Sequence, residues 1–215
     1  MELQQIIEEI KSRMSGPTSV SLTQLGVSYK VNYGVSIPEL STIAEIYKGN
    51  HKLALELFDQ DIRECKILAS MIDDPEQVTG EQIDNWAQSF TNIEIVEQVC
   101  SNLLWKTDCA LSRSIEWCLG NDELLQKAGL IIVGRSASKE VKDAVFEPYI
   151  ELIDNYDDQQ IAQNKISIEF ALRQIGKRNT ELKAKVLELA QQFANSNDEH
   201  KAWIGGQLLY EFDEE

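Results

Sequence analysis

The sequence predicts an all-α protein, and three observations carry this prediction. Apolar residues recur every three or four positions in nearly every segment, as they do along one face of a helix. No run of alternating β-branched residues is flanked by hairpin turns. The connections between periodic segments are only about two to five residues long, so successive helices must pack as antiparallel neighbours. Many short helices in such an order favour a helical solenoid over a closed bundle.

The chain begins with an amphipathic helix, followed over 15–35 by an irregular stretch that contains the turn-forming SGPTS and NYG. We expect one domain over 1–215, in which 1–35 form an N-terminal helix and irregular arm and 36–215 form the helical repeats. The apolar periodicity predicts later helices over 61–72, 79–90, 107–119, 122–136, 158–175, 180–194 and 198–211.

Polar residues and glycines mark the ends of several of these helices. Asp61 is the expected N-cap of the 61–72 helix, and Thr79 with Gln82 has the spacing of a capping box. Thr91 with Glu94 has the same spacing and predicts the start of the next helix.

Three further residues are expected to end, start or divide helices in the second half of the chain. Gly120 is expected to stop one helix at its C-terminus, and Asn121 to cap the following one. Pro148 should kink or divide the helical pattern over 139–154, because it lacks an N–H and clashes with the preceding turn.

The composition is that of an ordinary globular protein, with 43% hydrophobic and 26% charged residues in 215. No apolar run approaches the roughly 18 residues of a membrane span, and the acidic N-terminus is unlike a secretory signal peptide. The four cysteines form no C-x-x-C pair and the chain has only two histidines. We therefore expect a cytoplasmic monomer with reduced thiols, no metal and no cofactor.

The net charge of −16 disfavours nucleic acid as a partner when it is taken as a whole. The charge is nevertheless uneven: residues 125–185 hold ten cations and nine acids, so the rest of the chain carries −17. Within this region 163–185 hold six cations and two acids. This stretch is either a solvated helical surface or a local anion-binding patch.

Six stretches of the chain are informative when they are taken in order: NYGVSIPEL (32–40), IDDPEQVT (72–79), QVCSNL (98–103), SIEW (114–117), FEPYIELI (146–153) and ALRQIGKRN (171–179). Together, and at compatible spacing, they resemble the DNA alkylation-repair glycosylases of the AlkD type, which are built from HEAT-like repeats. The resemblance implies a right-handed superhelical solenoid of antiparallel helix pairs that cradles duplex DNA and excises cationic N3- or N7-alkylpurines. Aromatic rings would face the cationic base, and a carboxylate would stabilise positive charge on the deoxyribose.

The resemblance also assigns the site residues. Glu97 takes the position of the catalytic Asp, and Ile93, four residues earlier, that of a Trp. Lys127 replaces a phosphate-binding Arg, Phe170 replaces a second Trp, and Arg173 is retained. Glu97, Lys127 and Phe170 keep the chemical type, whereas Ile93 has no π-face, and losing base stacking costs roughly 1–3 kcal/mol. We therefore expect weakened or lost glycosylase activity.

Two alternatives stay open at this point. Taken singly, these residues are also typical of a solvated carboxylate (Glu97), core side chains (Ile93 and Phe170) and surface cations (Lys127 and Arg173). The chain could instead be a non-catalytic repeat scaffold that binds a basic protein or peptide segment in its concave groove.

Overall fold

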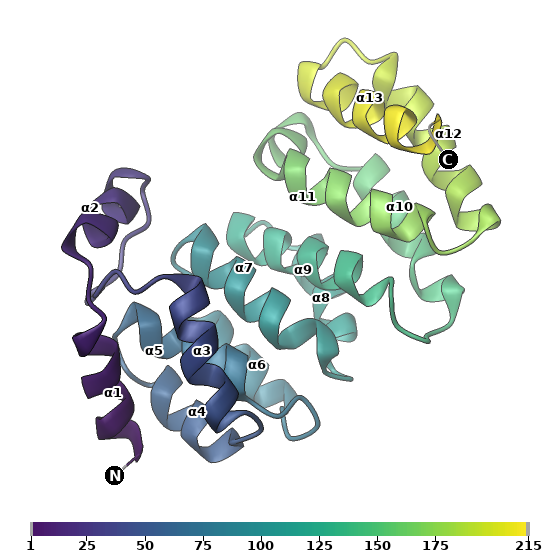
Figure 1. Cartoon of the computed structure of the whole chain (residues 1–215). Coiled ribbons are helices and arrows are strands. Elements are labelled where there is room, and N and C mark those ends of the chain that lie inside the picture. Colours follow the sequence, from purple (N-terminus) through teal and green to yellow (C-terminus); the bar gives the residue numbers. More distant parts are fainter. Residues whose placement is uncertain (1, 214–215) are drawn as a thin grey trace. The chain divides into compact units, whose positions relative to one another are not determined.

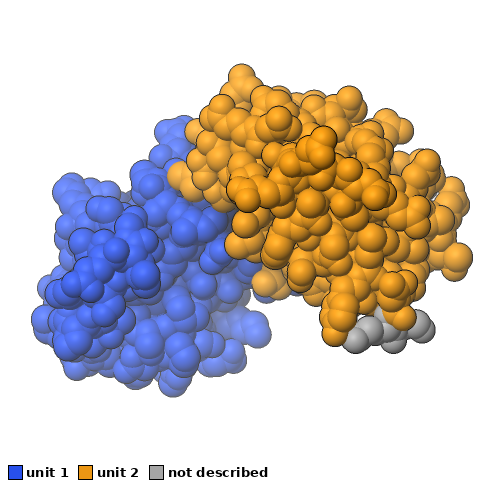
Figure 2. All heavy atoms as spheres, turned by 90° about the horizontal axis from the view of Figure 1, so that it is seen from above, with its two compact units in different colours: residues 1–109 blue, residues 110–215 orange. Residues whose placement is uncertain are grey.

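The computed structural model describes residues 2–213, and its regular structure there is entirely helical (Figure 1). An isolated parallel bridge between Val31 and Ile62 is the only β-type pairing in that range. The chain divides into two compact units, residues 1–109 and 110–215, coloured separately in Figure 2.

The first unit contains seven α-helices and a short 3-10 helix within its described part. They are α1 (Glu2–Ser12), α2 (Gly16–Gln24), α3 (Ile37–Tyr47), α4 (His51–Phe58), α5 (Arg63–Ile72), α6 (Gly80–Ala87), α7 (Ile93–Asn102) and η1 (Leu104–Lys106). Helix α5 is central, because α3, α4 and α7 all pack against it. Its residues Cys65, Ile67, Leu68, Ala69 and Ile72 are completely buried.

The second unit contains six α-helices and one 3-10 helix within its described part. They are α8 (Ala110–Leu119), α9 (Glu123–Ser136), η2 (Asp143–Val145), α10 (Glu147–Asp154), α11 (Asp158–Gly176), α12 (Thr180–Ala194) and α13 (Glu199–Asp213). Sequential pairs pack together, α8 on α9 and α12 on α13, and α11 packs against α9, α12 and α13. The predicted all-α class is confirmed, and Pro148 divides the 139–154 pattern by standing in the first turn of α10.

The stretch over 15–35 is not wholly irregular, because α2 lies within it. Ser15 caps this helix by accepting from the Thr18 N–H at 3.4 Å, and Pro17 occupies the first turn. The SGPTS stretch is thus the start of a helix and not an irregular turn. Ser and Pro are common in turns, but they are also common at the N-cap and in the first turn of a helix, so the sequence alone does not separate the two. Gly34 lets the following segment approach α2: its φ is +74°, and a Cβ there would lie 2.1 Å from the Ser15 carbonyl oxygen.

Three predicted helix caps are wrong, each by one residue. Asn92 caps α7, rather than Thr91, and Asp122 caps α9, rather than Asn121. Asp61 does not cap α5; its carboxylate instead binds Lys30 Nζ at 2.5 Å.

The ends predicted at Thr79 and Gly120 are only partly as expected. Thr79 caps α6 as predicted, but the Gln82 side chain donates to Asp73 at 2.7 Å and leaves the capping box open. Helix α8 ends before Gly120, as expected, yet Gly120 does not adopt the positive φ of a left-handed stop.

Candidate functional site

Helix α7 carries Ile93 and Glu97 on one exposed face. Asn92 starts this helix by accepting from the Ile95 N–H at 3.1 Å. The opposite face, with Ile95, Val96, Val99 and Cys100, is buried. Ile93 is 37% exposed, and Glu97, one turn later, is also exposed. Residues four apart lie on the same face of a helix, so Ile93 and Glu97 are neighbours on an accessible surface of the first unit.

The Glu97 carboxylate has no direct partner among residues 2–213. Partial burial raises the pKa of Glu97 above its ordinary value, and the negative charge of Glu94 on the same helix raises it further. A carboxylate in such a place gains from any positive charge brought close to it, because no protein cation already neutralises it.

The first turn of α7 is held by a buried ionic network. Arg63 on α5 donates to both Glu94 oxygens, from Nε at 2.8 Å and from Nη2 at 2.6 Å. The Tyr29 hydroxyl donates to Glu94 at 2.9 Å, and burial together with the Glu94 charge raises the pKa of Tyr29. These bonds tie α7 to α5 and to the segment that follows α2.

Glu64 extends this network into the core of the first unit. It is fully buried, and it accepts from the backbone N–H groups of Tyr33, Gly34 and Val35 and from Arg63 Nη1 at 3.0 Å. A buried carboxylate that is paired and hydrogen-bonded in this way orders the 32–35 segment without leaving an uncompensated charge. This cluster could not be predicted from the sequence, because its partners come from distant parts of the chain.

The other predicted site residues belong to the second unit. Lys127 on α9 forms an ion pair with Glu123, one turn earlier on the same helix. Arg173 on α11 donates from Nε to Glu169 at 2.8 Å, and its Cζ lies 6.0 Å from the Phe170 ring centroid.

Phe170 is partly buried against α9, where a Cβ on Gly134 would lie 2.6 Å from its ring. Helices α9 and α11 pack against each other, so Lys127, Phe170 and Arg173 lie on neighbouring elements of one unit. Each of the two cations is already paired with a glutamate of its own helix.

The cations of 163–185 are largely engaged by other parts of the second unit. Lys177 pairs with Glu211, Lys185 pairs with Glu147 at 2.8 Å, and Lys183 lies 5.0 Å from the Phe212 ring centroid. Arg178 pairs with Asp143 at 2.7 Å and donates to the carbonyl groups of Ala137, Lys139 and Val141. The count of positive charge along 163–185 could not show these partners, because they lie outside that stretch.

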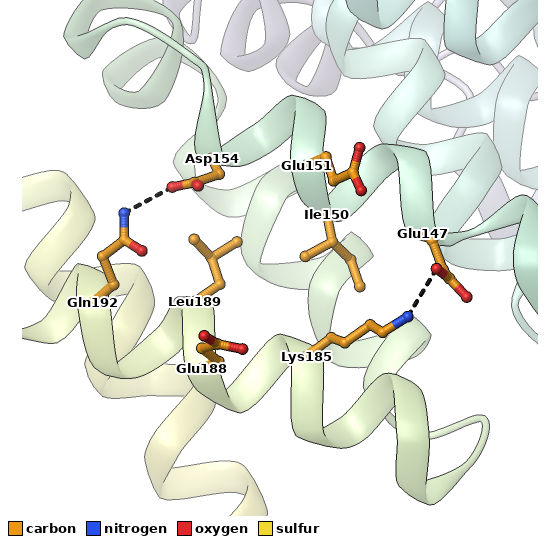
Figure 3. A pocket seen from close by; sticks show the side chains of 8 residues that line it. All are labelled: Glu147, Ile150, Glu151, Asp154, Lys185, Glu188, Leu189 and Gln192. Carbon is orange, nitrogen blue, oxygen red and sulfur yellow. Dashed lines mark hydrogen bonds and ion pairs between the residues drawn. The ribbon is translucent and has the colours of Figure 1, made fainter.

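A groove of about 260 Å³ between α10 and α12 is acidic (Figure 3). Its lining is Glu147, Ile150, Glu151, Asp154, Lys185, Glu188, Leu189 and Gln192. Lys185 is its one cation and is bound to Glu147, while Gln192 donates to Asp154 at 2.8 Å. The remaining charge is negative, and it surrounds an apolar floor formed by Ile150 and Leu189.

The described range shows no sign of thiol chemistry, a metal centre or a membrane span. None of the four cysteines forms a disulfide, and burial raises the pKa of the Cys65 and Cys118 thiols to about 12, which disfavours the reactive thiolate. No cluster of three acidic, histidine or cysteine side chains there could hold a metal ion. Between residues 2 and 213, every helix is too short or too polar to span a bilayer.

Comparison with known proteins first defines the class. One solved structure, described as "A new family of proteins related to the HEAT-like repeat DNA glycosylases with affinity for branched DNA structures", matches with a TM-score of 0.79 at 18% identity. The match covers 100% of this chain and 95% of that one, and it confirms the predicted HEAT-like repeat fold.

The family itself follows from the sequence. The model of the DNA alkylation repair enzyme family matches residues 7–201, so the chain belongs to that family. No curated protein matches the chain.

Proposed function

We propose that this protein binds DNA and excises cationic N3- or N7-alkylpurines slowly or not at all. The observation that carries the proposal is the exposed face of α7, where Glu97 retains an unpaired carboxylate and Ile93 supplies no aromatic ring. The Glu97 carboxylate suits base excision as the family performs it, whereas the aliphatic side chain of Ile93 weakens the recognition of a cationic base.

In this proposal Glu97 acts on the deoxyribose. Loss of an alkylated, cationic purine leaves oxocarbenium-like positive charge on the sugar, which a nearby carboxylate stabilises while it orients the attacking water. The Glu97 side chain is one methylene longer than the Asp expected at this place, and misplacement by about 1 Å can cost on the order of 100-fold in rate.

The second unit would contribute DNA contacts. Arg173 and Lys127 would bind phosphates, and Phe170 would offer a ring to a base. Both cations would first have to leave Glu169 and Glu123, which lowers the affinity expected of them.

The related protein's affinity for branched DNA extends the proposal to the form of the DNA. A protein that has lost most base excision can still recognise the backbone of a junction, because phosphate contacts need no flipped base. We therefore include three- and four-way junctions beside linear duplexes as ligands.

The decisive experiment measures release of 7-methylguanine and 3-methyladenine from methylated duplex DNA. Under single-turnover conditions, wild type should exceed spontaneous depurination by a small factor, and Glu97→Gln should return to that background. Equal release by the two proteins above background would remove Glu97 from the chemistry, and equal release at background would show that excision has been lost. Binding to linear and branched DNA is measured separately by fluorescence anisotropy at about 50 mM salt, which favours phosphate contacts.

The acidic groove between α10 and α12 favours a second candidate, a scaffold for a basic protein segment. Its carboxylates and apolar floor would complement a lysine- or arginine-rich peptide with an interposed apolar side chain. A Glu151→Lys, Glu188→Lys double variant should abolish capture of such a peptide. Tight, salt-sensitive binding of DNA by wild type, with no peptide binding, would exclude this candidate.

A further inference from the structure

A second recess lies in the first unit, close to the start of α7. It has a volume of about 390 Å³, and its lining is Ser28, Tyr29, Lys30, Asp61, Lys66, Gln88, Ser89 and Thr91. Two lysines and three aliphatic hydroxyl groups outnumber the single carboxylate. Such a composition is unusual for a chain of net charge −16 and suits an oxyanion with several acceptor oxygens.

Lys66 is the positioned cation of this recess. Its Nζ donates to the Phe58 carbonyl oxygen at 2.8 Å and to Ser89 Oγ at 3.3 Å, and it lies 4.5 Å from the Phe58 ring centroid. An ammonium group has three N–H donors, so these neutral acceptors leave one donor for a ligand. The partial burial of this cation lowers the pKa of Lys66, and an anion in the recess would offset that cost.

The other groups of the recess can adapt to an anion. Lys30 is bound to Asp61 at 2.5 Å, but both side chains are mostly exposed, so water competes with the pair and an anion can take over the lysine. Because Ser89 Oγ accepts from Lys66, its own hydroxyl hydrogen is available, and Thr91 supplies another donor. Glu94, the nearest carboxylate on α7, is already engaged by Arg63 and Tyr29.

We propose that this recess binds a phosphate group, and that in the DNA complex the group is a backbone phosphate beside the nucleotide held at Ile93 and Glu97. Thr91 lines the recess and precedes Ile93 by two residues, so a bound phosphate would lie at the end of α7 that presents the candidate site. The DNA part of this inference rests on the proposed function, whereas the phosphate site itself does not.

The first arm of the test uses a duplex oligonucleotide of about 20 base pairs and measures its dissociation constant as a function of salt. Lys30→Gln and Lys66→Gln should each weaken binding, and together they should reduce the slope of log K against log salt by about 0.9 for one lost phosphate contact. Lys52→Gln is the matched control: it removes the same charge from an exposed lysine of α4 that pairs with Glu56. An unchanged slope in the double variant, with wild type binding DNA, contradicts the proposal and leaves the proposed function standing.

The second arm uses inorganic phosphate and no DNA. In the full-length protein, millimolar phosphate should shift the backbone amide NMR signals of Gln88, Ser89 and Thr91, and Lys66→Gln should abolish the shifts. Lys30→Glu should also abolish the shifts. Because Lys30 is exposed, its replacement does not disturb the core, so this variant controls for a folding defect in Lys66→Gln. Shifts without any DNA binding would mean that the recess takes a free phosphate and that the proposed function fails. If no shift occurs and the salt slope is unchanged, there is no phosphate site.

Discussion

At the scale of single residues, the proposed site combines a carboxylate with an aliphatic side chain in place of an aromatic ring. Glu97 and Ile93 share a face of α7, and both are accessible to a ligand. The carboxylate can stabilise a sugar cation, but the aliphatic side chain cannot attract a cationic base through a π-face. Restoring the ring therefore tests directly whether Ile93 limits excision.

Ile93→Trp should raise the single-turnover rate of 7-methylguanine release by about tenfold, in line with the 1–3 kcal/mol that base stacking contributes. The exposed position leaves the core of the first unit unaffected. Ile93→Leu serves as the control, because it keeps the bulk and lacks the ring. No gain from the Trp variant, in a protein that binds the duplex as tightly as wild type, would show that another departure limits the rate.

The raised pKa of Glu97 predicts an acid limb in the pH profile. Excision needs the ionised carboxylate, so the rate should fall as the pH drops through the Glu97 pKa, which lies above the ordinary 4.5 of a glutamate. Rates corrected for spontaneous depurination, measured from about pH 4 to pH 8, locate the midpoint of this limb. A profile that is flat, or that rises toward acid, would contradict the assignment.

The same raised pKa of Glu97 predicts how the Glu97→Gln substitution affects the stability of the fold. A folded-state pKa above the unfolded value contributes stability below the unfolded pKa, which is lost as the pH rises through the folded pKa. At neutral pH the ionised Glu97 therefore gives no stabilisation, and the Tm of Glu97→Gln should equal or exceed that of wild type. Any loss of activity in this variant is then not a loss of fold.

At the scale of elements, helix identity could be predicted from the sequence, and exact helix ends could not. The apolar periodicity of 180–194 coincides with α12, and that of 158–175 with α11 to within one residue. The caps failed where two polar residues stand side by side, as at Thr91-Asn92 and Asn121-Asp122, because either side chain can accept the same N–H. Glu94 matched a capping pattern, but tertiary pairing with buried Arg63 prevailed.

Alanine substitutions at two glycines, Gly134 and Gly206, are expected to change the stability of the second unit in opposite directions. Gly134→Ala would push against the Phe170 ring, 2.6 Å from the new Cβ, and should destabilise the second unit by about 1–3 kcal/mol through overpacking. Gly206→Ala, on an open face of α13, meets no atom within 4 Å and should stabilise by about 0.5–1 kcal/mol. Urea unfolding midpoints measure both, and destabilisation by the two variants alike would refute the packing assigned to Phe170.

At the scale of the whole molecule, the structure shows which cations of this chain of net charge −16 are already neutralised by carboxylates. Counted along the chain, the cations of 163–185 are compatible with a solvated surface or an anion-binding patch, and in the structure Lys177, Arg178 and Lys185 are paired with carboxylates from other segments of the second unit. A count along the chain could not detect this neutralisation, because it depends on tertiary contacts. The recess around Lys66, by contrast, lies in a part of the sequence where no positive excess is visible.

This distribution predicts a weak salt dependence of DNA binding for a protein of this family. If all six cations of 163–185 contacted phosphates, the slope of log K against log salt would be about −5, at roughly −0.9 per phosphate. Because each pair must open before its cation reaches DNA, we expect a slope between about −2 and −3, measured by anisotropy from about 25 to 150 mM KCl. Glu169→Gln, which removes the ion-pair partner of Arg173, should steepen the slope by up to one contact, whereas Glu45→Gln on α3 removes the same charge without breaking an ion pair. A wild-type slope near −5 would mean that the ion pairs open on DNA and that the positive patch is restored in the complex.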